Sequence, residues 1–85
     1  MNLSRTRVRT DELEGGDIVR RAYRSPKEGE IQEEFRTIVV GQVLPAAVWY
    51  REGIHQVIRV VGLDVREGLP VSWLAVPDQH LTVIR

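Results

Sequence analysis

The chain has 85 residues, 42% of them hydrophobic, which is enough for one small domain and too little for two hydrophobic cores. Twelve basic and twelve acidic residues give a formal net charge of zero, so any contact with nucleic acid or a membrane must be local. With no cysteine, a disulfide framework, a thiol nucleophile and a zinc–thiolate site are all excluded.

The composition favours β-structure. Val and Ile together account for nineteen residues, and branching at Cβ suits a pleated, half-buried surface. No apolar stretch approaches the roughly 20 residues that span a bilayer, and the charged N-terminus has no signal-peptide core. Eleven of the twelve basic residues are Arg, a bias typical of a GC-rich genome. We therefore expect a soluble, cytoplasmic, β-rich domain with no membrane contact.

The first 34 residues carry charge in four alternating blocks, positive over 1–10, negative over 11–17, positive over 20–27 and negative over 28–34. Within the first block Arg5, Arg7 and Arg9 alternate with other residues. In an extended chain these arginines project from one face, about 6.8 Å apart. Residues 1–10 are thus predicted to form an arginine-rich arm or an edge strand.

A short helical turn is predicted over 11–14, capped by Thr10 and stopped by two glycines. The first full strand is expected over Asp17–Arg24. A long charged loop then follows through Glu34, since Pro and Gly interrupt that stretch. The next strand, 35–44, is apolar on both faces and is predicted to be central, with Pro45 ending it.

Two further strands are predicted over 47–51 and 54–62, joined by a tight turn at Glu52-Gly53. Another strand is expected over 71–76. A turn at 77–79, with one turn of 3₁₀ helix, then leads into the closing strand, 80–84. Five or six short strands in this order match a small SH3-like β-barrel, formed by residues 11–85 behind the N-terminal arm. Barrel closure would also remove exposed strand edges.

Catalytic and metal chemistry have little support in the residues. The histidines, His55 and His80, have no neighbouring His or Cys, so we expect no metal and no cofactor. The serines lie in no nucleophile motif, and no glycine-rich phosphate loop is present. An enzyme is not the favoured interpretation.

Charged residues are the main candidates for binding. The Arg5, Arg7 and Arg9 face is suited to phosphate contact, and its alternatives are a solvated edge strand or ion pairing with the acidic block that follows. The charged loop and the strand before it are a second candidate for partner binding, with a surface ion-pair network as the alternative. The candidate residues of this second region are Arg20, Arg24, Glu30, Glu33 and Glu34.

Three large aromatic residues lie in the body of the chain. Trp49, Tyr50 and Trp73 could serve base stacking or a peptide groove, or simply form the core. Because Trp49 and Tyr50 are adjacent in a predicted strand, they must point to opposite faces, so at least one should be partly exposed.

The sequence resembles the MazF/PemK toxin family, which consists of small barrels that act as metal-independent endoribonucleases or, in relatives, as gyrase poisons. By this resemblance Arg36 is the catalytic arginine, stabilising charge on the scissile phosphate. The chain has Thr37 where the family usually has proline, and it lacks the family's C-terminal helix, so an inactive relative is also implied. The matching segments are Gly16-Asp17-Ile18-Val19, Arg36 before Ile38-Val39-Val40, Gly68-Leu69 and Asp78-Gln79.

The hairpin over 48–61 is similar to hairpins of small barrels that serve as connector or other minor proteins of bacteriophages. The favoured hypothesis is a non-enzymatic binding or adaptor protein of a phage or GC-rich bacterium. It would act by protein–protein contact or self-assembly, in the host cytoplasm or a virion. Two alternatives stay open, a nucleic-acid binder using the N-terminal arginines and a toxin-like ribonuclease.

Overall fold

The fold is all-β. The computed structural model describes residues 4–27 and 30–85, and for residues 23–27 and 30–33 it describes the backbone only. No helix in this part of the chain is long and apolar enough to cross a membrane. The elements are β1 (Arg5–Arg9), a 3₁₀ turn η1 (Thr10–Glu12), β2 (Ile18–Lys27), β3 (Glu30–Tyr50), β4 (Gly53–Asp64), β5 (Leu69–Ala75) and β6 (His80–Ile84).

The strands form one antiparallel sheet in the order β1-β6-β2-β3-β4-β5. This sheet is not closed into a barrel, because β1 pairs only with β6 and β5 only with β4 among the described strands. The prediction of barrel closure is therefore wrong. Pairing between β2 and β6 is limited to two positions, Ile18–Ile84 and Val19–Val83, beyond which the strands have no further register. The all-β prediction is confirmed, and residues 5–9 form an edge strand of the sheet.

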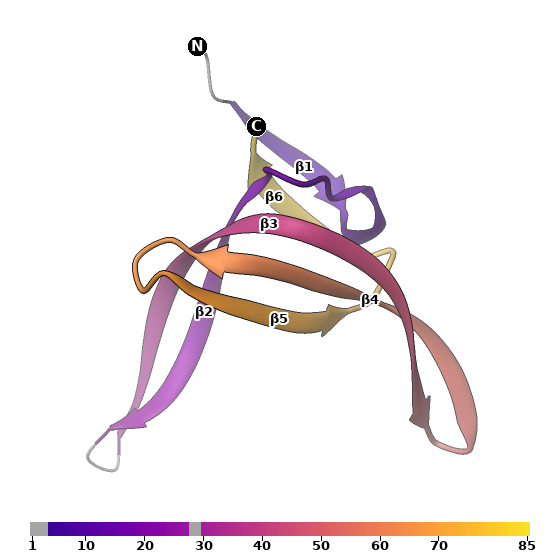
Figure 1. Cartoon of the computed structure of the whole chain (residues 1–85). Helices are drawn as coiled ribbons and strands as arrows, with labels where there is room; N and C mark the ends of the chain where they lie inside the picture. Colours follow the sequence, from indigo (N-terminus) through magenta and orange to yellow (C-terminus); the bar gives the residue numbers. More distant parts are fainter. Residues whose placement is uncertain (1–3, 28–29) are drawn as a thin grey trace.

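β3 determines the shape of the molecule. Its 21 residues would extend about 70 Å if straight, yet the longest dimension of the molecule is 42 Å. Figure 1 shows β3 as an arch that runs from the tip of one hairpin to the tip of the other. It pairs with β2 over its first half and with β4 over its second, and both partners are present only at Ile38 and Val39.

The expected strand end at Pro45 is wrong, because β3 continues through it to Tyr50. β2 pairs no further along β3 than Val39, so Pro45 has a strand neighbour on the β4 side alone. Proline is tolerated in a strand with one unpaired edge.

The prediction of a long charged loop through Glu34 is also wrong. β2 continues to Lys27 and β3 begins at Glu30, so most of residues 25–34 belong to a hairpin. The backbone register sets Arg24 opposite Glu33 and Lys27 opposite Glu30. Opposite charges at facing positions favour such pairing, so the alternating charge blocks fit two paired strands.

Smaller differences concern the turns. The 3₁₀ turn covers Thr10–Glu12, and the Thr10 hydroxyl donates to the Gln79 carbonyl oxygen at 2.9 Å instead of capping the turn. The β3–β4 turn is centred on Arg51 and Glu52, one residue earlier than predicted, with φ of 49° and 59°. The turn before β6 is confirmed, with the Gln79 amide donating to the Val76 carbonyl at 3.1 Å, but residues 77–78 form no 3₁₀ helix.

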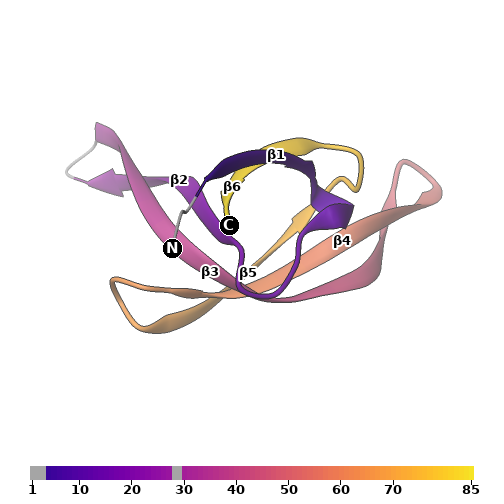
Figure 2. The same cartoon turned by 90° about the horizontal axis from the view of Figure 1, so that it is seen from above.

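The core lies between β1 and β6 on one side and the middle of β3 and β4 on the other, as seen from above in Figure 2. Packing is tight where β4 crosses β3, because a Cβ on Gly62 would stand 2.7 Å from Ile38 Cγ2. We call the sheet face that carries the core the inner face and its reverse the outer face. The core residues are Val8, Leu13, Val19, Val40, Val60 and Val83, with Ile38 also buried.

A β-bulge at Gly41 interrupts the β3–β4 register, since Val40 faces Gly62 while Gln42 faces Val61. Even-numbered residues of β3 face the core before the bulge, as Ile38 and Val40 do. After it the odd-numbered Val43 packs against the core. The inner face of the outer β3–β4 hairpin therefore carries Trp49, which lies opposite Ile54.

Candidate binding surfaces

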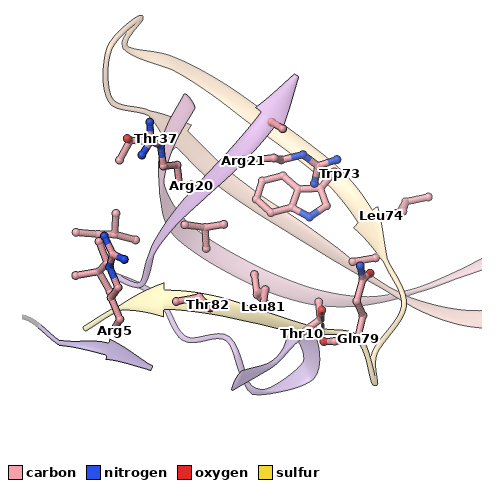
Figure 3. Close-up of a pocket in the computed structure, with 15 residues that line it drawn as sticks. Arg5, Thr10, Arg20, Arg21, Thr37, Trp73, Leu74, Gln79, Leu81 and Thr82 are labelled. Carbon is pink, nitrogen blue, oxygen red and sulfur yellow. Dashed lines mark hydrogen bonds between the residues drawn. The ribbon is translucent and has the colours of Figure 1, made fainter. Parts of the chain in front are cut away.

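A groove lies between β2, β6 and β5, where the sheet fails to close. Its volume is about 690 Å³, within the range of roughly 300–1,000 Å³ typical of ligand pockets. Figure 3 shows Arg5, Arg20 and Thr37 at one end and Thr10 and Gln79 at the other. Its lining residues include three arginines, Arg5, Arg20 and Arg21, and none of those described is acidic. The apolar lining includes Val19, Trp73, Leu74 and Leu81.

Arg21 and Trp73 form the central contact of the groove. The Arg21 guanidinium carbon lies 4.3 Å from the centre of the Trp73 ring, a cation–π geometry. Trp73 packs against the core, which confirms the core interpretation for this residue. Arg20 also lines the groove, and its guanidinium carbon lies over exposed Phe35, 5.0 Å from the ring centre. The groove is thus positively charged at its rim and apolar within.

The arginine face of β1 has two members available to a partner. Arg5 and Arg7 are exposed and make no ion pair with any described residue. Arg9 is engaged, because its Nη2 lies 2.8 Å from Asp11 Oδ2 and its Nε donates to Asp11 Oδ1. The ion-pair interpretation is therefore correct for Arg9. For Arg5 and Arg7, contact with a partner stays a prediction.

The side chains of Arg24, Glu30 and Glu33 lie outside the described residues. Glu34 is exposed and pairs with Arg66 Nη1 at 3.3 Å and with Arg36 Nη2 at 3.8 Å. The predicted ion-pair network therefore includes Glu34, but with partners from outside the predicted set.

Arg36, the arginine of the toxin resemblance, is held by a buried carboxylate. Its Nη1 lies 3.3 Å from Asp64 Oδ2, and the Asp64 side chain is fully buried. The other Asp64 oxygen accepts the backbone N–H groups of Arg66 and Glu67 at 3.0 and 3.2 Å, which closes the turn after β4. This geometry gives Arg36 a structural contact that joins β3 to the end of β4.

Asp17 is a second buried carboxylate, and it connects the segment before β2 to Arg85 at the end of the given chain. Arg85 Nε donates to Asp17 Oδ1 at 2.9 Å, and Arg85 Nη2 donates to the Glu12 carbonyl at 3.1 Å. The hydrogen bond from Arg85 to Asp17 is the main cause that raises the pKa of Arg85 above its ordinary value. A raised pKa keeps the Arg85 guanidinium charged at every pH below that value, so titration of Arg85 adds no pH dependence to stability near neutrality.

The β3–β4 hairpin carries the most exposed aromatic residues. We define the hairpin tip as residues 48–55. Trp49 is 72% exposed, Tyr50 57% and Ile54 67%, so both members of the aromatic pair are exposed. Arg51 covers the Tyr50 ring at 5.1 Å, and the His55 and Tyr50 rings meet edge to face at 6.2 Å.

No cluster of three or more metal-ligating side chains occurs among the residues whose side chains are described. No protein-family model, curated protein or solved structure matches the chain. Its surfaces must therefore be interpreted from their own chemistry. Sequence reasoning missed Asp17, Asp64 and Arg85, whose ion-pair partners are 28 or 68 residues away in the chain.

Proposed function

We propose that the protein is a non-enzymatic binding module that acts by protein–protein contact within an assembly, through the hairpin tip. The observation that carries this proposal is the exposure of Trp49, Tyr50 and Ile54 at the end of a two-stranded projection. Trp and Tyr are enriched among residues that dominate binding energy at protein interfaces. Burial of each such side chain contributes about 1.5–3 kcal/mol.

The total accessible surface supports the same proposal. It is 6622 Å², whereas a compact monomer of 9.7 kDa exposes about 5,100 Å². The difference of about 1,500 Å² exceeds the roughly 800 Å² that each partner buries in a standard interface. The arginine bias of the sequence and the resemblance to small phage proteins support a virion or a regulatory complex of a GC-rich host as the setting.

Site-specific photo-crosslinking in the native host tests the proposal. A photoreactive residue at Arg51, in the tip, should give one defined cross-linked product, either with a second copy or with one other protein. The same residue at Ser72, exposed on β5, is the matched control and should not give that product. Trp49→Ala should abolish the product at Arg51. A chain that gives no product specific to the tip contradicts the proposal.

Nucleic-acid binding by β1 is the second candidate, favoured by exposed Arg5 and Arg7, which make no ion pair with any residue that the structure describes. Two phosphate contacts would give a small salt dependence, with a slope of about −2 in log affinity against log salt. Fluorescence anisotropy of a labelled 12-nucleotide DNA tests this candidate across salt concentrations. Replacement of both arginines by Ala should remove binding, and the absence of wild-type binding at low salt would exclude this function.

A further inference from the structure

The groove between β2, β6 and β5 presents strand edges that have no strand partner. β6 pairs with β2 only through Val83 and Ile84, so residues 80–82 and, across the groove, residues 20–22 have no register on the groove side. β5 pairs with β4 alone among the described strands. An extended segment could pair with such an edge through its own backbone, as in β-strand addition.

The side chains of the groove select the chemistry of that segment. Arg5, Arg20 and Arg21 contribute positive charge, and no described lining residue is acidic. Thr37, Thr82 and Gln79 add hydroxyl and amide donors, while Val19, Trp73 and Leu81 form an apolar interior. A β-strand presents alternate residues to opposite faces. A strand that alternates carboxylates with aliphatic residues would therefore match both the charged rim and the apolar interior.

We propose that the groove binds an extended acidic peptide segment of a partner protein. Aliphatic side chains and unpaired strand edges favour a peptide over single-stranded nucleic acid. Nucleic acid needs exposed aromatic faces for successive bases, and Trp73, the one aromatic ring among the described lining residues, already carries the Arg21 guanidinium. This site is separate from the hairpin tip, so either proposal can fail alone.

A fluorescence titration tests the proposal, using Trp73 emission in the Trp49→Phe background. The probe is a ten-residue peptide of alternating Glu and Val. The controls are the same peptide with Lys for Glu, ten-nucleotide oligo(dT), and inorganic phosphate. We expect saturable binding of the Glu peptide alone, with affinity that falls as salt rises. Equal binding of the Lys peptide, tighter binding of oligo(dT), or no binding of the Glu peptide at millimolar concentration overturns the proposal.

Paired variants locate the bound peptide. Replacement of Arg5 and Arg20 by Gln removes two exposed guanidinium groups of the groove and should weaken binding of the Glu peptide at least about tenfold. Replacement of Arg7 and Arg59 by Gln removes the same charge from exposed positions outside the groove and should change the affinity less than about twofold. Equal losses in the two variants would show attraction by net charge and overturn the site.

Discussion

At the scale of single residues, the buried carboxylates of Asp64 and Asp17 accept backbone N–H groups of nearby turns and also contact an arginine. Asp64 is fully buried, yet it accepts two backbone N–H groups and faces the Arg36 guanidinium. A buried charge is tolerated when it is paired and hydrogen-bonded. Asp17 is likewise 4% exposed, accepts the Glu14 N–H at 2.9 Å and pairs with Arg85. Both carboxylates therefore combine a turn hydrogen bond with an arginine contact from a distant part of the chain.

Substitution of Asp64 should separate these two roles. Asp64→Ala leaves two turn N–H groups without an acceptor and Arg36 without its buried partner, so we expect a loss of about 3 kcal/mol in the free energy of unfolding. Asp64→Asn keeps an acceptor oxygen for the turn and should lose about half as much. Urea denaturation measures both, with exposed Asp78→Ala as the control. Equal losses for Ala and Asn would show that the charge, and not the turn, carries the stability.

Glu52 should be replaceable with a gain in stability. It follows Arg51 in the two-residue turn of β3–β4, and both residues adopt positive φ. A non-glycine residue there is strained by about 1 kcal/mol, and the type I′ hairpin turn favours Asn-Gly. Glu52→Gly should therefore raise the free energy of unfolding by about 1 kcal/mol. Glu67→Gly, in a turn without positive φ at that position, should give no gain, and a gain there would refute the conformational explanation.

At the scale of elements, the arch of β3 depends on the close approach of β4 at Gly62 and on the β-bulge at Gly41. Gly62 allows β4 to meet β3 directly, because a Cβ there would lie 2.7 Å from both Ile38 Cγ2 and the Val39 carbonyl oxygen. At Gly41 a Cβ would lie 3.4 Å from the nearest atom, which is an ordinary contact. The two glycines therefore differ in what they permit.

Gly62→Ala should destabilise the protein by about 2–3 kcal/mol, since the extra methyl group must displace Ile38 or the β3 backbone. Gly41→Ala is the matched variant and should cost less than about 0.5 kcal/mol. Thermal unfolding followed by circular dichroism compares the two. A Gly62→Ala variant as stable as the wild type would show that the β3–β4 crossing is looser than the contact distances indicate.

The elements also show what the sequence could predict. The alternation of side chains indicated a strand at each of the six places where one occurs, because side-chain period is a local property, but it divided β3 into two strands. It failed at Pro45 and over residues 25–34, since whether a strand tolerates Pro or Gly depends on which edges have neighbours. Asp64 shares the parity of core-facing Val60 in one strand, a signal that could have marked it as buried. The groove was not predictable, because it depends on where β2 and β6 stop pairing.

At the scale of the whole molecule, two hairpins extend from a small core. The radius of gyration is 14.3 Å, compared with about 12 Å for a compact chain of this length. Free strand edges usually invite aggregation, and two of the free edges here contain a proline, Pro45 in β3 and Pro70 in β5. This placement opposes indiscriminate edge pairing while leaving side-chain contacts at the tip available.

Amide hydrogen exchange should distinguish the small core from the weakly held hairpins. In dilute solution, amides of the tip, residues 48–55, should exchange at least roughly a hundredfold faster than those of Ile38 and Val60, because the tip has few buried contacts to lose on opening. Mass spectrometry of exchanged peptides measures the difference. Protection of the tip that increases with protein concentration would indicate a second copy as its partner. Uniform protection along β3 at high dilution would contradict a stable core with weakly held hairpins.

The bulge at Gly41 decides which side chains of the outer hairpin lie on the inner face. It takes one residue out of the alternation of β3, so that Val43 and Trp49 lie on the same face as Val40. If Gly41 were paired as an ordinary strand residue, Tyr50 would turn toward the inner face in place of Trp49. Loss of the bulge with the residue retained would thus invert the hairpin while leaving the sequence unchanged. The identity of the side chains that a partner meets is set by one residue that need not touch the partner.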